Sequence, residues 1–139
     1  MSVRRKGREC ALQILYQADV LAKAEQSEEQ GVNTTERLGR FSAANVSTAI
    51  ENFFSHFDAP TEVFEHASSI VRGTHRNLTQ IDQLISEHSP NWRIDRMSIV
   101  DRNVARLATY ELLFCPDIPT NVILDEGIEI ARRFGTDKS

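Results

Sequence analysis

Four cations near the start of the chain are the first residues whose types and spacing suggest a chemistry. They are Arg4, Arg5, Lys6 and Arg8, and the first eight residues contain no acid. Guanidinium and ammonium groups clustered in this way bind phosphates, such as those of a nucleic-acid backbone. A solvated basic run without a ligand is the competing interpretation, and the cluster alone does not decide between the two.

An aromatic residue, Tyr16, lies eight residues beyond Arg8 and close to it in angle on a helix. Its ring would then lie beside the basic cluster, where an RNA base could stack on it. A half-buried core tyrosine is an equally good interpretation of the same position.

One carboxylate, Glu111, falls inside an apolar helical face, between Leu107, Ala108 and Cys115. A buried carboxylate needs hydrogen bonds or an ion pair to offset its desolvation. We therefore favour a structural acid that caps a neighbouring helix or pairs with an arginine. A catalytic acid is the alternative, because perturbed carboxylates occur at active sites.

The remaining reactive side chains show no catalytic or metal-binding spacing. Cys10 and Cys115 lie in apolar patterns without a CxxC pair, which predicts reduced thiols. The histidines lack metal-ligand spacing, and no Ser/His/Asp or paired-carboxylate arrangement emerges; they are His56, His66, His75 and His88. We expect a protein that is not an enzyme and that uses neither a metal nor a cofactor.

Composition restricts where a nucleic acid would bind. The chain has 139 residues, 40% hydrophobic and 26% charged, with a formal net charge of −4. An acidic protein of this kind is not a general nucleic-acid binder, so any such site should be local to the basic amino-terminal end. No run approaches the roughly 20 apolar residues of a membrane span, and no signal peptide is evident. These features predict a cytoplasmic protein.

The chemistry-bearing residues must be positioned by helices, because apolar residues recur at intervals of three and four. This spacing predicts helices over 3–22, 44–57, 60 to about 88, and 119–134, with Gly135 as a left-handed helix ending. Residues 23–43 are predicted to form a long polar loop with a short helix after Thr34 or Thr35. Trp92 should anchor the turn after Pro90, while Thr136 and Asp137 resemble the start of another helix.

The segment 94–114 is predicted to be the central helix of a bundle. Val100, Val104, Leu107, Ala108 and Leu112 fall on one side of it. Ser98 and Asp101 form a capping-box pattern at its start, and Pro116 marks its end. No strand pattern, phosphate loop or repeat competes with an all-α fold.

In combination and order, several segments resemble the NusB family of transcription antitermination factors. The segments are RRKGRECALQILYQAD, VRGTHRNLTQIDQLI, DRMSIVDRNVARLATYELL and DIPTNVILDEGIEIARRFGTDKS. The resemblance implies an all-α fold of two packed antiparallel helical subdomains, about 1–76 and 77–139, within one RNA-binding domain spanning 1–139. Residues 23–60 show little specific similarity.

The resemblance also implies a function and a set of site residues. The family binds boxA RNA together with the ribosomal protein NusE, within the transcription elongation complex, during ribosomal RNA transcription. The implied RNA-binding residues of this chain are Arg4, Arg5, Lys6, Arg8, Tyr16, Asp101, Arg106, Phe134 and Gly135. Two alternatives stay open: a NusB-like accessory domain of a ribosomal RNA methyltransferase, and a helical adaptor for other proteins.

Two departures from the family pattern lead to further expectations. Gly7 replaces a helix-favouring residue, which should let the first turns fray until a ligand binds. The family continues after FGTDKS with a last helix that this sequence lacks. We therefore expect an exposed groove near Leu112, Leu124 and Ile128, through which two copies could form a homodimer.

Overall fold

A computed structural model describes residues 2–25, 33–89, 91 and 93–135, and every regular element within these ranges is a helix. The all-α prediction is therefore confirmed. The elements are α1 (Val3–Glu25), α2 (Thr34–Gly39), α3 (Ala43–Ser55), α4 (Thr61–Arg76), α5 (Leu78–His88), the 3₁₀ turn η1 (Ile94–Arg96), α6 (Ile99–Phe114) and α7 (Thr120–Phe134).

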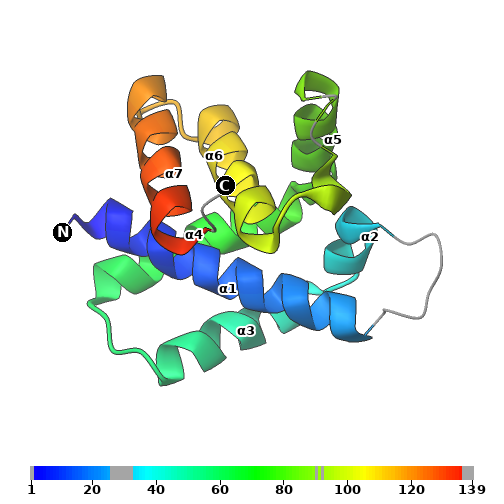
Figure 1. Cartoon of the computed structure of the whole chain (residues 1–139). Helices are drawn as coiled ribbons and strands as arrows, with labels where there is room; N and C mark the ends of the chain where they lie inside the picture. Colours follow the sequence, from blue (N-terminus) through cyan, green and yellow to red (C-terminus); the bar gives the residue numbers. More distant parts are fainter. Residues whose placement is uncertain (1, 26–32, 90, 92, 136–139) are drawn as a thin grey trace.

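Helix α1 runs through the middle of the molecule. Helices α5, α6 and α7 stand beside one another on one side of it, and α3 lies on the opposite side (Figure 1). Helix α1 contacts α4 and α6 most extensively, so it links elements on both sides of the predicted boundary near residue 76. The division into two subdomains stays a prediction.

The main core forms where one face of α1 meets α3, α4, α6 and α7. Its buried members are Ala11, Leu12, Ile14, Leu15, Val46, Ile50, Ile70, Val71, Leu107 and Ile130. Burial of this apolar surface is the main source of stability for helices that would be marginal alone. The core therefore fixes the direction of α1 and of the cations at its start.

Side-chain caps define where three of the helices begin, and Asn33 caps α2 by accepting from the Glu36 N–H. The Ser42 side chain accepts a hydrogen bond from the Asn45 N–H, and the Asn45 side chain accepts one from the Ser42 N–H, so α3 begins with a complete capping box. At α6, Ser98 Oγ accepts from the Asp101 N–H at 3.0 Å. Ser98 is thus confirmed as the residue that caps the central helix, but among the described residues only this half of the predicted capping box is present, and residues 94–96 of the predicted helix form η1 instead.

Several predicted boundaries need correction. Helix α1 continues to Glu25 instead of ending at 22, and the predicted single helix over 60–88 is two helices separated at Asn77. The short helix after Thr34 is present as α2. Gly135 has φ −86° and ψ 179°, which is extended backbone and not the predicted left-handed ending. The rest of the polar loop (26–32), Pro90, Trp92, Thr136 and Asp137 lie outside the described residues.

Two glycines allow helices to approach closely. A Cβ atom on Gly7 would meet the ring of His66, and one on Gly73 would meet the ring of Tyr110. Gly73 thus allows a close contact between α4 and α6. Gly7 lies within α1 and lets an α4 side chain pack directly on the helix backbone. Within the described residues, no helix is long and apolar enough to span a membrane.

Candidate nucleic-acid interface

Three of the four predicted cations lie at the exposed start of α1. The Arg4 side chain is 51% exposed and its Nη2 lies 3.4 Å from Asp117 Oδ2. Arg5 donates two hydrogen bonds to Glu126, at 2.7 and 2.9 Å, and is also partly exposed. Lys6 Nζ lies 3.8 Å from Glu9 Oε2 and 4.8 Å from the centre of the Phe57 ring. These residues keep an accessible cationic surface, although each has an acid nearby.

The fourth cation, Arg8, does not belong to that surface. Its guanidinium is buried and donates to both carboxylate oxygens of Glu111, at 2.7 and 2.8 Å. The prediction of Arg8 as an RNA contact is corrected, because its donors are directed into the protein. Glu111 is instead shown to be the structural acid paired with an arginine that the sequence favoured.

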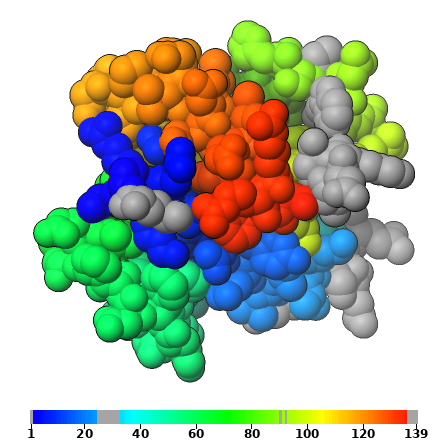
Figure 2. Space-filling model, turned by 60° about the vertical axis from the view of Figure 1, so that its left-hand side comes forward, coloured from blue at the N-terminus to red at the C-terminus, as the bar shows by residue number. Residues whose placement is uncertain are grey.

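The end of α7 adds cations that the sequence analysis missed. Arg133 pairs with Glu9 of α1, and its guanidinium carbon lies 5.8 Å from the centre of the Phe134 ring. Arg132 is exposed beside it. Figure 2 shows the start of α1 and the end of α7 on the same face of the molecule. The only sequence signal was the pair of arginines immediately before Phe134.

A hollow of about 300 Å³ lies between α1, α6 and α7. It is lined by Leu12, Gln13, Tyr16, Gln17, Val100 and Phe134. Tyr16 is 41% exposed and Phe134 36% exposed, so both rings reach solvent at its wall. The structure thus brings together two of the predicted site residues that are 118 positions apart in the sequence. Two aromatic faces and two side-chain amides can stack on a base and hydrogen-bond its edge.

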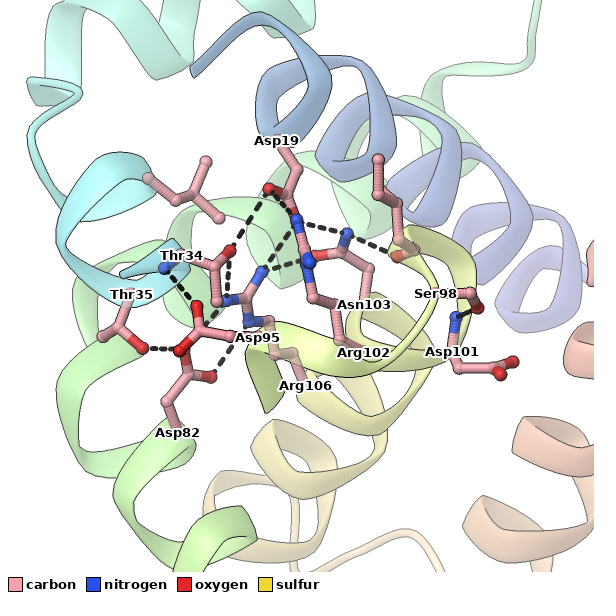
Figure 3. A network of polar contacts seen from close by, with 12 residues as sticks. Asp19, Thr34, Thr35, Asp82, Asp95, Ser98, Asp101, Arg102, Asn103 and Arg106 are labelled. Carbon is pink, nitrogen blue, oxygen red and sulfur yellow. Dashed lines mark hydrogen bonds and ion pairs between the residues drawn. The ribbon is translucent and has the colours of Figure 1, made fainter. Parts of the chain in front are cut away.

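Two further predicted residues lie next to this hollow. Asp101 is in the first turn of α6, directly after the lining residue Val100. Its carboxylate points away from the neighbouring arginines in Figure 3. Gly135 follows Phe134 at the end of α7. Both positions suit the rim of a binding site, although neither residue lines the hollow itself.

Arg106, the last predicted site residue, lies in a buried polar network and not at the surface. It is fully buried, and it donates two hydrogen bonds to Asp82 at 2.9 Å and one to Asp19 at 3.1 Å (Figure 3). Arg102 donates two more to Asp19, at 2.6 and 2.7 Å. The prediction of Arg106 as an RNA contact is therefore corrected. Its guanidinium joins α6 to α1 and α5.

The central acid of this network is held in its charged form. Burial by itself raises the pKa of Asp19, but hydrogen bonds from Arg102 and the charges of Arg102 and Arg106 outweigh it. The net result is a lowered pKa. The network therefore holds α1, α5 and α6 together through buried ion pairs. Among the described residues, no group of acidic, histidine or cysteine side chains could hold a metal ion.

The two cysteines are free, and burial raises the pKa of both thiols. They therefore remain protonated near neutral pH, which makes them poor nucleophiles. Cys10 is fully buried, whereas Cys115 is partly exposed.

Comparison with known proteins relates this arrangement to one family. A model of the NusB family matches residues 5–139. The transcription antitermination protein NusB of Geotalea uraniireducens is 41% identical over 139 residues, covering all of this chain and 87% of that protein. The protein of the same name from Thermotoga maritima is 56% identical over 75 residues, covering 54% of this chain and 53% of that protein.

Solved structures agree with the sequence matches. A structure of T. maritima NusB has a TM-score of 0.69 and 36% identity, and covers 97% of this chain and 80% of that one. A chain in the crystal structure of a plectonemic RNA supercoil has the same TM-score at 23% identity, covering 99% and 86%. The second match supports the fold alone.

Proposed function

The chain belongs to the NusB family, whose relatives named above are transcription antitermination proteins and not enzymes, and we propose how it performs that role. It binds boxA RNA together with NusE, in the cytoplasm, as part of the complex that transcribes ribosomal RNA. The observation that carries the proposal is that the end of α7, which contributes Phe134 to the hollow along the middle of α1, lies on the same face of the molecule as the cations at the start of α1 (Figure 2). An accessory domain of a methyltransferase has no comparable support from the relatives described above.

The cations of the site would bind the RNA backbone by exchanging their carboxylate partners for phosphates. The Arg4–Asp117 pair is exposed on both sides, and pairs of this kind contribute little to stability. A phosphate can therefore replace Asp117 at low cost. Lys6 can exchange Glu9 for a phosphate, because Arg133 also pairs with Glu9 and would keep that buried carboxylate partnered. Arg5 is bound more firmly, by two hydrogen bonds to Glu126, and would act through its remaining exposed surface.

The hollow would bind a base from the same strand. Stacking on Tyr16 or Phe134 requires no particular base, because every base has a π-face. The side-chain amides of Gln13 and Gln17 each carry a donor and an acceptor that can contact a base edge. In this arrangement the backbone contacts provide affinity and the amides provide sequence preference.

Removing two surface cations should weaken RNA binding and its dependence on salt. We expect the variant Arg4→Gln/Lys6→Gln to bind boxA RNA less tightly, with the salt slope reduced by about 1.4 for two lost phosphate contacts. Filter binding across a series of salt concentrations measures both quantities. The matched control is Arg93→Gln/Arg96→Gln, which removes two exposed arginines around η1. An unchanged slope in the first variant, or an equal decrease in the control, contradicts the assignment.

NusE is proposed to bind a face other than the RNA-binding one and to add basic surface of its own. Capture of NusE in the absence of RNA, compared with a direct boxA shift, separates this role from that of an adaptor for proteins alone. An adaptor would capture NusE without shifting boxA.

The apolar residues expected at a groove are exposed. Leu112, Leu124 and Ile128 on α6 and α7 are 42%, 49% and 53% exposed. We hypothesise that two copies associate through this face, and expect the mass measured by light scattering to increase with concentration. Replacing Ile128 by Lys should abolish that increase. A constant monomer mass over the whole series argues against the dimer.

A further inference from the structure

A small cavity between α3 and α4 has two arginines in its lining. It has a volume of about 190 Å³ and is lined by Ala43, Val46, Arg72, His75 and Arg76. Among the residues that the structure describes, no carboxylate lines it, although the chain contains 20 acids and 16 lysines and arginines. We propose that this cavity binds a phosphate group, at a site separate from the RNA-binding hollow described above.

The three titratable residues come from one face of α4. Arg72, His75 and Arg76 are spaced by three and four residues, which makes them neighbours on the helix surface. Arg72 Nη1 donates to Ser47 Oγ at 2.7 Å, and this bond holds the guanidinium beside α3. His75 Nε2 lies 3.2 Å from the Leu38 carbonyl oxygen, which can only accept, so this nitrogen carries the proton. Arg72 and His75 are thus positioned before any ligand arrives.

Helix α3 contributes to the same positive potential. Ala43, the first residue of this 13-residue helix, lines the cavity. The Ser42 side chain already accepts from the Asn45 N–H, but the N–H groups of Ala43 and Ala44 lack intrahelical partners, and the positive end of the helix dipole lies there. Two guanidinium groups and a helix amino terminus therefore meet at the cavity, an arrangement that suits a phosphate.

A purely structural role explains only part of this cluster. His75 and Arg76 are in the last turn of α4, where cations offset the carbonyl end of the helix dipole. Arg72 lies one turn earlier, and the Gly73 carbonyl already accepts from the Asn77 backbone and side chain. Among the described residues, neither Arg72 nor Arg76 forms an ion pair with a carboxylate. Arg72, which is half-buried and held by Ser47, and Arg76, which is exposed, therefore bring to the cavity two guanidinium charges that an anionic ligand can neutralise.

The size of the cavity limits the class of ligand. Sites for drug-sized molecules usually have volumes of about 300–1,000 Å³. A cavity of about 190 Å³ fits a phosphate group but not a complete nucleotide. The group belongs either to an RNA backbone, with its bases outside the cavity, or to a small free phosphate, and the experiment below distinguishes these sources.

The test is a titration of the full chain with inorganic phosphate, followed by NMR of the backbone amides of Ala43 and Ala44. We expect a saturable shift that the variant Arg72→Gln/Arg76→Gln weakens by about tenfold or more, because it loses two charge-assisted contacts. The variant Arg72→Lys/Arg76→Lys should retain part of the affinity. Arg93→Gln/Arg96→Gln, with the same loss of charge elsewhere, should bind phosphate as the unmodified chain does.

The source of the phosphate is decided by adding a twelve-residue oligouridylate to the phosphate-bound protein. Displacement of the phosphate assigns the site to RNA, and continued binding of both assigns it to a free phosphate; either result supports the site. A linear shift without saturation, or equal weakening in the Arg93/Arg96 control, overturns the proposal. So does unchanged binding by the Arg72→Gln/Arg76→Gln variant. None of these results depends on boxA binding.

Discussion

Replacing Arg106 by methionine is expected to lower the free energy of unfolding by about 3–5 kcal/mol, the usual effect of removing one partner from a buried ion pair. Methionine keeps much of the side-chain volume but has no donors. Asp82 would lose both of its hydrogen bonds from Arg106, and Asp19 would keep only Arg102 and Asn103 as charged or amide partners. Urea unfolding monitored by circular dichroism measures the change.

This loss is a large fraction of the free energy of unfolding of a typical domain, about 5–15 kcal/mol. The matched control is Arg96→Met, which removes an exposed arginine next to α6 and should alter stability by less than about 0.5 kcal/mol. If Arg106→Met and Arg96→Met have equally small effects, the buried network does not join α6 to α1 and α5 as described.

A second large effect is expected when Arg8 is replaced by methionine. Glu111 is buried and both of its carboxylate oxygens accept from Arg8, so the variant leaves an unpaired buried charge. We expect a destabilisation of about 3–5 kcal/mol. The double variant Arg8→Met/Glu111→Leu should recover most of it, because an apolar pair of similar volume has no charge to desolvate. Urea unfolding of the single and double variants forms a double-mutant cycle.

The same double variant also tests the corrected role of Arg8. Because Arg8 faces Glu111 and not solvent, the double variant should bind boxA RNA with about the affinity of the unmodified chain. Filter binding under the salt conditions used for the Arg4/Lys6 variant provides the comparison. Equal stability of the double and single variants would refute the ion-pair account, and a loss of RNA affinity in a stable double variant would restore Arg8 as a contact.

Helical periodicity predicted most elements of this fold because each helix buries an apolar face. The start of α6 at Ser98 could be predicted because a cap is a local interaction between residues three apart. The break at Asn77 could not, because the apolar spacing continues through Leu78 and Ile81 in the next helix. Nothing local distinguishes one long helix from two short ones with matching faces.

The burial of a charged side chain was predictable for one residue of α6, Glu111, and not for two others on the same helix. Glu111 stands among apolar residues, so its need for a partner was visible, but the identity of Arg8 depends on how α1 crosses α6. Arg106 was predicted to contact RNA and the burial of Arg102 was not predicted, because only the fold brings Asp19 and Asp82 to them. Long-range ion pairs between helices leave no periodic signal.

In the candidate interface too, local features could be predicted from the sequence and contacts between helices could not. The cluster at the start of α1 is local and was visible in the sequence, whereas the division between exposed Arg4 and buried Arg8 depends on helix packing. Resemblance to the family suggested Tyr16 and Phe134 separately. Their meeting at one hollow follows from the contact of α7 with the rest of the bundle.

Titration of boxA RNA into the variant Tyr16→Leu/Phe134→Leu tests whether an RNA strand that crosses the α1 cations places a base in the aromatic hollow. Leucine keeps the apolar character of each position but removes the stacking face. Base–aromatic stacking contributes about 1–3 kcal/mol per base, so affinity should fall by about 10- to 100-fold. The control Phe64→Leu, which removes a comparably exposed ring on α4, should bind as the unmodified chain does. If the Tyr16/Phe134 variant folds normally and binds boxA RNA with undiminished affinity, the hollow is not the base site and the account is contradicted.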